Sequence, residues 1–357
     1  MLYLPEAALD VIKIFTLGVL SFLVAFVLTP FLTKVLYKYQ LWRKEVRTQA
    51  VDGQDLMYFQ KFHSEGETHI PRFGGILIWI VPAFLAILLY LLAKADLGIW
   101  WISKLNFLDR GQTWLPFFAL GSAALVGFLD DFLQVMGRGK YIAKGLTLKQ
   151  RIILMGFIGS IGAWWFYSKL EWSSLHVPGL GDFEIGIWYL PLFIIVMMAT
   201  YSGGVIDGLD GLAGGAFAAI FGAFAGIALF LGQINVAAFC AVILGALLAF
   251  LWFNIPPARF YMGETGMMGL TAALTVVAFL TNSVLVLPII GFLLVLESGS
   301  VILQLFSKKL RHKKLFLAAP IHHHFEAKGW PAHQITMRFW IIGVIAAILG
   351  LSIRLLG

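Results

Sequence analysis

The chain has 357 residues, of which 60% are hydrophobic and only 13% are charged. A soluble globular protein of this size needs more charged surface, so the composition excludes that class and indicates a polytopic membrane protein. The formal charge of +7 comes from basic residues in loops beside apolar runs. This placement favours anionic lipid or phosphate ligands, and we expect no nucleic-acid partner. The single cysteine, Cys240, excludes an intramolecular disulfide framework.

Apolar segments, each near the ~20 residues that a helix needs to cross a bilayer, predict an all-α fold with about ten membrane spans. We expect one transmembrane domain over residues 1–357. The first segment is too long for a signal peptide and no cleavage site follows it, so it should remain as a span. In the ninth segment, Pro288, Gly291 and Gly299 favour a break or a kink. The expected spans are roughly 12–36, 73–93, 113–133, 150–168, 186–202, 213–231, 235–253, 266–282, 284–306 and 338–356.

Three loops are rich in lysine and arginine, and they alternate with loops that are poor in basic residues. By the positive-inside rule we expect the basic loops, 37–72, 134–151 and 307–338, to face the cytoplasm. An even number of spans then places both termini outside the cytoplasm. The same topology brings four polar clusters to the cytoplasmic side, whereas chance would scatter them over both sides.

The first cluster is Tyr201–Gly214, which reads Y-S-G-G-V-I-D-G-L-D-G-L-A-G and lies between two apolar runs. A carboxylate near hydrocarbon is costly, so it indicates a functional site by default. Asp207 and Asp210 are three residues apart and would share one face of a helix. The glycines would let a ligand approach the backbone. The alternative is a cytoplasmic turn that happens to be acidic.

The second cluster is G-F-L-D-D-F at 127–132, at the end of the third expected span. Adjacent acids point in different directions on a helix, so one of Asp130 and Asp131 would face a ligand and the other a supporting partner. A helix C-terminus disfavours negative charge, which favours a functional reason for the pair. The alternative is an interfacial helix end with solvated acids.

The third cluster is the loop F-N-I-P-P-A-R-F-Y-M-G-E-T-G at 253–266. Tyr261 would stack on a base, Asn254 offers an amide, and Glu264 would hold a divalent cation together with substrate phosphates. The alternative is a Pro-Pro turn with an interfacial tyrosine. The fourth cluster, A-P-I-H-H-H-F-E-A-K-G-W at 319–330, contains three successive histidines that cannot all bind one metal from a regular helix. They would bind phosphate or orient carboxylates.

Acids, basic residues and histidines gathered at one membrane face suit phosphoryl transfer with Mg²⁺. A lipid-borne acceptor would explain why such a site lies in a membrane.

These motifs resemble those of the bacterial phospho-N-acetylmuramoyl-pentapeptide transferases, in the polyprenyl-phosphate N-acetylhexosamine-1-phosphate transferase superfamily. The resemblance covers nearly the whole chain, and its most specific parts are 207–212, 253–258 and 319–330. It implies a Mg²⁺-dependent enzyme of the bacterial inner membrane. Such an enzyme transfers phospho-MurNAc-pentapeptide from UDP-MurNAc-pentapeptide to undecaprenyl phosphate, giving lipid I and UMP for peptidoglycan synthesis. The resemblance also suggests a homodimer.

The resemblance implies a role for each matched residue. Asp130 matches the proposed base on the lipid phosphate, and Asp207 matches a carboxylate close to the metal and the diphosphate. The implied catalytic residues are Asp130, Asp131, Asp207, His322, His323 and His324; the implied substrate-binding residues are Asn254, Gly208, Leu209, Asp210 and Tyr261; the implied metal ligands are Glu264 and Asp207.

Several positions depart from the family pattern. The metal-binding aspartate of the family is Glu264 here, and its extra methylene moves the carboxylate by about 1 Å, enough to cost ~10²-fold in rate. The family has Ser, Asn, Lys and Lys where this chain has Met267, Gly204, Gln134 and Glu67. Arg72 and Lys61 are candidates to replace the lysine that is missing at position 67.

These departures keep two alternatives open. One is a divergent or inactive paralogue, or an enzyme that uses another UDP-sugar or polyprenyl phosphate. The other is an ion-coupled transporter, but the acids lie at the ends of the spans and the sequence shows no internal repeat, in contrast to many transporters.

Overall fold

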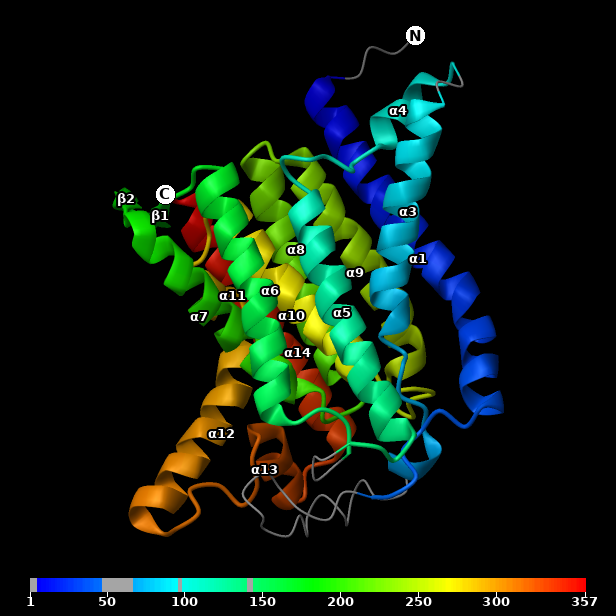
Figure 1. The fold of residues 1–357 in the computed structure, drawn as a ribbon, viewed down its shortest axis with the longest axis vertical. Coiled ribbons are helices and arrows are strands. Elements are labelled where there is room, and N and C mark those ends of the chain that lie inside the picture. Colours follow the sequence, from blue (N-terminus) through cyan, green and yellow to red (C-terminus); the bar gives the residue numbers. More distant parts are fainter. Residues whose placement is uncertain (1–4, 47–66, 96–97, 140–143) are drawn as a thin grey trace.

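The computed structural model describes residues 5–46, 67–95, 98–139 and 144–357. Helices dominate this part of the chain, with a single small hairpin at one end, which confirms the expected all-α class (Figure 1). The α-helices are α1 (Glu6–Lys38), α3 (Ile76–Lys94), α4 (Trp100–Leu105), α5 (Trp114–Val135), α6 (Leu148–Lys169), α7 (Tyr189–Ser202), α8 (Leu212–Phe230), α9 (Ile234–Asn254), α10 (Gly263–Leu280), α11 (Leu287–Ile290), α12 (Phe292–Arg311), α13 (Ile321–Ala327) and α14 (Ala332–Leu355). The hairpin pairs β1 (Ser174–Val177) with β2 (Gly181–Glu184), and the 3-10 turns η1 (Gly186–Trp188) and η2 (Gly203–Ile206) flank α7.

Eight helical segments in the described chain are long and apolar enough to cross a membrane, which confirms a polytopic membrane protein. They are α1, α3, α5, the segment η1–α7–η2, α8, α9, α10 and α14. The fourth expected span forms α6, but its first turn carries Lys149 and Arg151, and it is not among the eight. The ninth expected span is broken at Gly291 between α11 and α12, as Pro288 and the glycines predicted.

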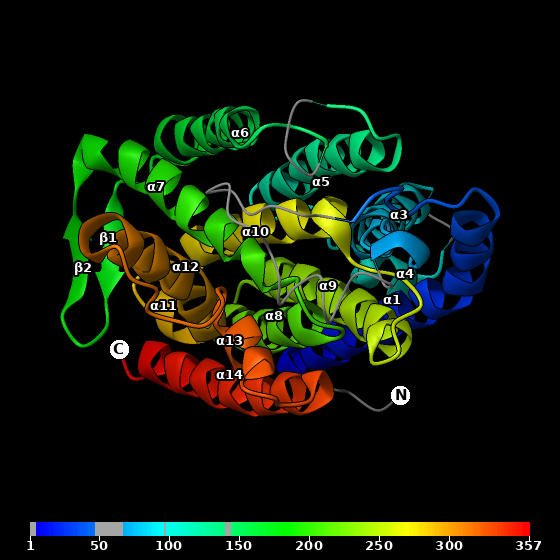
Figure 2. The ribbon, with the colours of Figure 1, turned by 90° about the horizontal axis from the view of Figure 1, so that it is seen from below.

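The central helix of the bundle is α10, in which 94% of the residues are buried. Figure 2 shows α8, α9 and α10 in the middle, with α5 and α6 on one side and α14 on the other. Small residues let these helices approach closely: a Cβ at Gly127 of α5 would collide with the backbone of Glu264 at the start of α10. This close approach brings the acidic end of α5 beside the first turn of α10.

The first turn of α1 and the end of α14 both lie toward the upper end of the bundle in Figure 1. The last residue, Gly357, accepts a backbone hydrogen bond from Gly179 in the β1–β2 hairpin at that end. The C-terminal ends of α5 and α12, the first turn of α6 and all of α13 lie at the lower end. All four polar clusters therefore have their described residues at the end opposite to the hairpin.

Candidate active site

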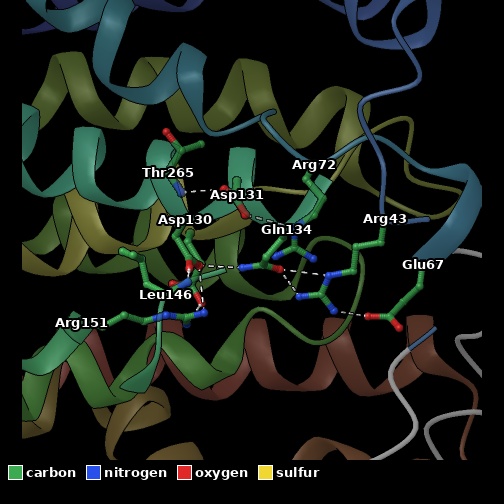
Figure 3. A network of polar contacts seen from close by, with 10 residues as sticks. Arg43, Glu67, Arg72, Asp130, Asp131, Gln134, Leu146, Arg151 and Thr265 are labelled. Atoms are coloured by element: carbon green, nitrogen blue, oxygen red, sulfur yellow. Dashed lines mark hydrogen bonds and ion pairs between the residues drawn. The ribbon is translucent and has the colours of Figure 1, made fainter. Parts of the chain in front are cut away.

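Two aspartates from distant parts of the sequence meet at the N-terminus of α10. The carboxylate of Asp131 accepts a hydrogen bond from the backbone N–H of Thr265 at 2.9 Å. The carboxylate of Asp207, which follows η2, accepts one from the backbone N–H of Gly263. The first N–H groups of a helix have no partners within the helix, and its dipole attracts negative charge. The start of α10 thus organises both acids, and Figure 3 shows the contact of Thr265 with Asp131.

Gly263 is required where these acids meet. Its φ of 72° lies in the left-handed region, which side chains with a Cβ rarely adopt. A Cβ at this position would also lie 2.5 Å from the Asp131 carboxylate. The absence of a side chain lets the first turn of α10 contact both carboxylates.

The neighbouring acid, Asp130, faces a different direction, as expected for adjacent residues on a helix. Its carboxylate is fully buried and accepts hydrogen bonds from the backbone N–H of Leu146 at 2.6 Å and from the amide of Gln134 at 2.6 Å. The guanidinium of Arg151 lies 2.9 Å from the same carboxylate. Such a set of donors stabilises the ionised form.

Arg151 joins this acid to the third cluster. Thr147 and Gln150 form a capping box that begins α6 and places Arg151 in its first turn. One guanidinium nitrogen contacts Asp130, and another contacts Glu264 at 2.7 Å. The Glu264 side chain is 26% exposed, whereas that of Asp130 is fully buried, so Glu264 is the member of the pair that a soluble ligand can reach.

Arg72 provides a second positive charge, on the Asp131 side. It follows Pro71, whose carbonyl accepts a hydrogen bond from the Tyr261 N–H, and it precedes Gly74, whose N–H donates to the Tyr261 carbonyl. These backbone hydrogen bonds to Tyr261 hold the Arg72 Nε atom 3.0 Å from Asp131. Burial lowers the pKa of Arg72, but the adjacent carboxylates of Asp131 and Asp207 outweigh that effect and raise it.

Asp207 lies outside the spans and is protonated more readily than an exposed aspartate. Burial raises its pKa to about 7, and the nearby charges of Glu264 and Asp131 act in the same direction, while Arg72 opposes them. An acid that titrates near neutral pH in a charged cluster is a candidate functional group.

The cluster also fits a divalent cation. In the described part of the cluster the carboxylates outnumber the guanidiniums, which favours a bound cation; the carboxylates are Glu67, Asp130, Asp131, Asp207 and Glu264, and the guanidiniums are Arg43, Arg72 and Arg151. No three histidine, cysteine or acidic side chains in the described residues are close enough to hold a metal on their own. Mg²⁺ often uses only one or two carboxylates and takes its other oxygens from substrate phosphates and water.

The residues expected to bind the base have mixed environments. Asn254 links two loops, since its side chain accepts from the Gly211 N–H and donates to the Phe260 carbonyl. Asp210 accepts from the Ala258 N–H at 3.0 Å. These contacts support the loops from inside, while Tyr261 is only partly buried beside them. Leu209 is buried, and Gly208 contacts His322.

The three histidines have three different partners, as expected for successive residues of a helix. His322 is fully buried and its Nδ1 lies 2.8 Å from Glu297 of α12. Its Nε2 has no hydrogen-bond partner among the described residues and points at Gly208, where a Cβ would overlap it. His323 contacts Glu326 at 2.6 Å, and His324 accepts from the Leu317 N–H. The described contacts therefore bring His322 against the aspartate loop.

Sequence reasoning missed Glu297 and the partners of the acids, Arg43 and Arg151. Glu297 is an acid inside an apolar segment, and that signal alone could have identified it. Of the two candidates for the missing lysine, Arg72 is in the site, whereas Lys61 lies outside the described residues. Two other departures are neighbours, because the Met267 side chain lies 3.8 Å from where a Cβ at Gly204 would be.

Membrane-length helices with carboxylates and guanidiniums gathered at one helix N-terminus define a polytopic membrane protein with a site suited to phosphate and metal chemistry. A family model described as "Glycosyl transferase family 4" matches residues 113–282. The phospho-N-acetylmuramoyl-pentapeptide-transferase of Lactiplantibacillus plantarum is 36% identical over 335 residues, 93% of this chain and 95% of the relative. That of Granulibacter bethesdensis is 35% identical over 353 residues, 93% and 90% of the two chains.

The chain therefore belongs to the family of phospho-N-acetylmuramoyl-pentapeptide transferases. This membership confirms the resemblance that the sequence motifs predicted.

Proposed function

We propose that this protein transfers phospho-MurNAc-pentapeptide from UDP-MurNAc-pentapeptide to undecaprenyl phosphate. An oxygen of the lipid phosphate attacks the β-phosphorus of the nucleotide sugar, the bond between the α- and β-phosphates breaks, and UMP leaves. The products are lipid I and UMP. Family membership supports this reaction, and the convergence of Asp131, Asp207 and Glu264 around the α10 N-terminus is the structural observation that carries it.

Each charged residue of the site has its own role in this proposal. Glu264 and Asp207 would hold Mg²⁺, which would supply positive charge against the diphosphate, and Arg72 balances the charge of the diphosphate and the leaving phosphate. Asp131 keeps the start of α10 and Arg72 in place. The resemblance assigns proton removal to Asp130. Its buried carboxylate has three donors, which favours a role in orienting Arg151, and a base role for it stays a prediction.

The orientation of the protein follows from the same proposal. UDP-sugars are made in the cytoplasm, so the end that carries the polar clusters would face the cytoplasm at the bacterial inner membrane. The described parts of the basic loops lie at this end, in agreement with the positive-inside rule. Both termini would then lie outside. The homodimer expected from the resemblance stays a prediction.

A divergent paralogue, active on another UDP-sugar or polyprenyl phosphate, is the second candidate. It is favoured by the contact of Glu264 with Arg151, which occupies one carboxylate oxygen of the expected metal ligand. Membership of the transferase family disfavours the ion-coupled transporter.

The test is UMP release by purified protein with undecaprenyl phosphate, UDP-MurNAc-pentapeptide and Mg²⁺. We expect release by the wild type, none by Asp207→Ala, and wild-type release by Asp182→Asn, which removes an exposed acid of the hairpin. UMP release only with UDP-N-acetylglucosamine would support the paralogue. No release above the Asp207→Ala control with any UDP-sugar would reject the transferase.

A further inference from the structure

We infer that Arg43 is a positioning residue for Asp130, which it orients through the side-chain amide of Gln134. This inference rests on the proposed function. It adds a residue that orients the Asp130 carboxylate from the segment after α1, outside the helices α5, α6 and α10 that form the rest of its surroundings. Arg43 follows α1, and no motif discussed above includes it.

The contacts form an unbroken relay across the lower end of the bundle (Figure 3). Two guanidinium nitrogens of Arg43, Nε and Nη2, donate to the same amide oxygen of Gln134, and the Nε contact is 3.0 Å long. The amide nitrogen of Gln134 donates to Asp130 at 2.6 Å. The remaining Arg43 nitrogen, Nη1, lies 2.6 Å from Glu67.

The double contact fixes the orientation of the amide. A glutamine side chain can present either its oxygen or its NH₂ group to a neighbour. Because Arg43 holds the oxygen at two points, only the NH₂ group can face Asp130. The rotated amide would set its oxygen against the carboxylate, so the relay selects one arrangement of the acid.

Burial strengthens this selection. The side chains of Arg43, Glu67 and Gln134 are at most 5% exposed, and that of Asp130 is fully buried. Hydrogen bonds to charged groups are stronger away from water, and a chain of them polarises each member. Glu67 compensates the charge of Arg43 and contacts the guanidinium nitrogen that does not contact Gln134. The relay also links the segment after α1 and the segment before α3 to the acid.

The geometry of Arg43 sets what its replacements should do. Arg43→Gln removes the double contact and frees the amide, so kcat should fall by about 10- to 100-fold, while KM for UDP-MurNAc-pentapeptide stays within about twofold. Arg43→Lys keeps the charge but cannot donate two hydrogen bonds to one oxygen in the geometry of a guanidinium. The kcat of this variant should lie between that of the wild type and that of Arg43→Gln. Lys44→Gln removes the adjacent, exposed positive charge and should keep wild-type kcat.

The effect of Gln134→Lys on kcat should have opposite signs with and without Arg43, which distinguishes positioning from structural support. In the Arg43→Gln background, Gln134→Lys would place a cation directly beside Asp130 and should raise kcat by about fivefold or more. In the wild-type background the same change sets a second buried cation against Arg43 and should lower kcat. The exchange of charge can also change stability in opposite directions, so the unfolding midpoints are measured alongside: a reversal in kcat at a temperature well below every midpoint reports the positioning of Asp130.

The experiment measures kcat, KM and the substrate-free unfolding midpoint for six proteins and for the double variant. The six are the wild type, Arg43→Gln, Arg43→Lys, Gln134→Lys, Lys44→Gln and Asp182→Asn; the double variant combines Arg43→Gln with Gln134→Lys. Opposite effects of Gln134→Lys in the two backgrounds support the relay. Wild-type kcat in Arg43→Gln, or the same effect of Gln134→Lys in both backgrounds, overturns it. If the wild type releases no UMP with any UDP-sugar, the proposed function fails, and the unfolding midpoints of the single and double variants test the relay by themselves. Non-additive changes in the midpoint retain the contact between Arg43 and Gln134, and additive changes overturn it.

Discussion

Gln134 donates a hydrogen bond of 2.6 Å to Asp130 from one turn further along α5. The resemblance predicts a lysine at this position, so the neutral amide would remove a positive charge from direct contact with the acid. Arg151 lies 2.9 Å from the same carboxylate, and Arg43 contacts the amide from behind. The charge expected at position 134 is therefore supplied by two guanidiniums from other segments. This exchange explains how the acid keeps its surroundings despite the departure.

Gly263→Ala should disrupt the site through collision with Asp131. The new Cβ would lie 2.5 Å from that carboxylate, at a φ of 72°. We expect a loss of UMP release of about 10²-fold and a lower unfolding midpoint. Gly232→Ala is the matched control, since Gly232 has a φ of 70° and open space around its Cβ position. It shares the backbone strain but not the collision. Equal effects of the two substitutions would show that strain alone is responsible and that the contact with Asp131 is unimportant.

Glu264→Asp and Glu264→Gln separate charge from geometry at the expected metal ligand. Aspartate keeps the carboxylate and should retain measurable UMP release. Glutamine loses the charge, and leaves the Arg151 guanidinium with one carboxylate in place of two, so release should fall below detection. The Mg²⁺ dependence of both variants is the measurement. Equal activity in the two variants would remove Glu264 from metal binding.

Gly204 and Met267 should respond as a pair. The resemblance predicts Asn and Ser at these positions, and here the Met267 side chain lies against Gly204. Gly204→Asn alone sets a polar side chain against a buried apolar one and should lower the unfolding midpoint by a few degrees. Adding Met267→Ser gives the new amide a partner and should recover at least half of that loss. Additive losses in the double variant would show that the two departures are independent.

Asp207→Asn should stabilise the substrate-free protein while it abolishes UMP release. Burial and adjacent acids raise the pKa of Asp207 from 3.8 to about 7, so the folded state binds more protons than the unfolded state between these values. The free energy of unfolding therefore falls as pH rises from about 4 to about 7. The asparagine variant lacks this loss, and its advantage over the wild type should be largest above pH 7 and vanish near pH 4. Unfolding midpoints in EDTA at pH 5 and pH 8 measure it. A variant that is less stable than the wild type at pH 8 would contradict the assigned shift.

Sequence reasoning predicted the all-α class and the meeting of the polar clusters at one end, because both follow from local apolar runs and from loop charge. It also predicted that Asp130 and Asp131 would face different partners, since helix periodicity requires it. Of the expected spans, the segments that form α6 and α12 are not among the eight helices of the described chain with spanning length and hydropathy, and both helices carry basic residues at the lower end.

The partners of the acids could not be predicted. Arg151 contacts Glu264 from 113 positions away, and Arg43 contacts Gln134 from 91 positions away. Such pairs depend on how the helices pack, which the spacing of residues along one chain does not encode. The roles of Asn254 and Asp210 were similarly open, since only the packed loops show that protein backbone occupies their polar atoms.

The most direct test of the shared acid site is the number of divalent cations that the protein binds with UMP, measured by Mn²⁺ electron paramagnetic resonance. We expect one Mn²⁺ per chain for the wild type and for Asp182→Asn, and a loss of at least tenfold in affinity for both Asp207→Asn and Glu264→Gln. If Mn²⁺ binds both variants with wild-type affinity, the acids do not share a cation and the account is wrong.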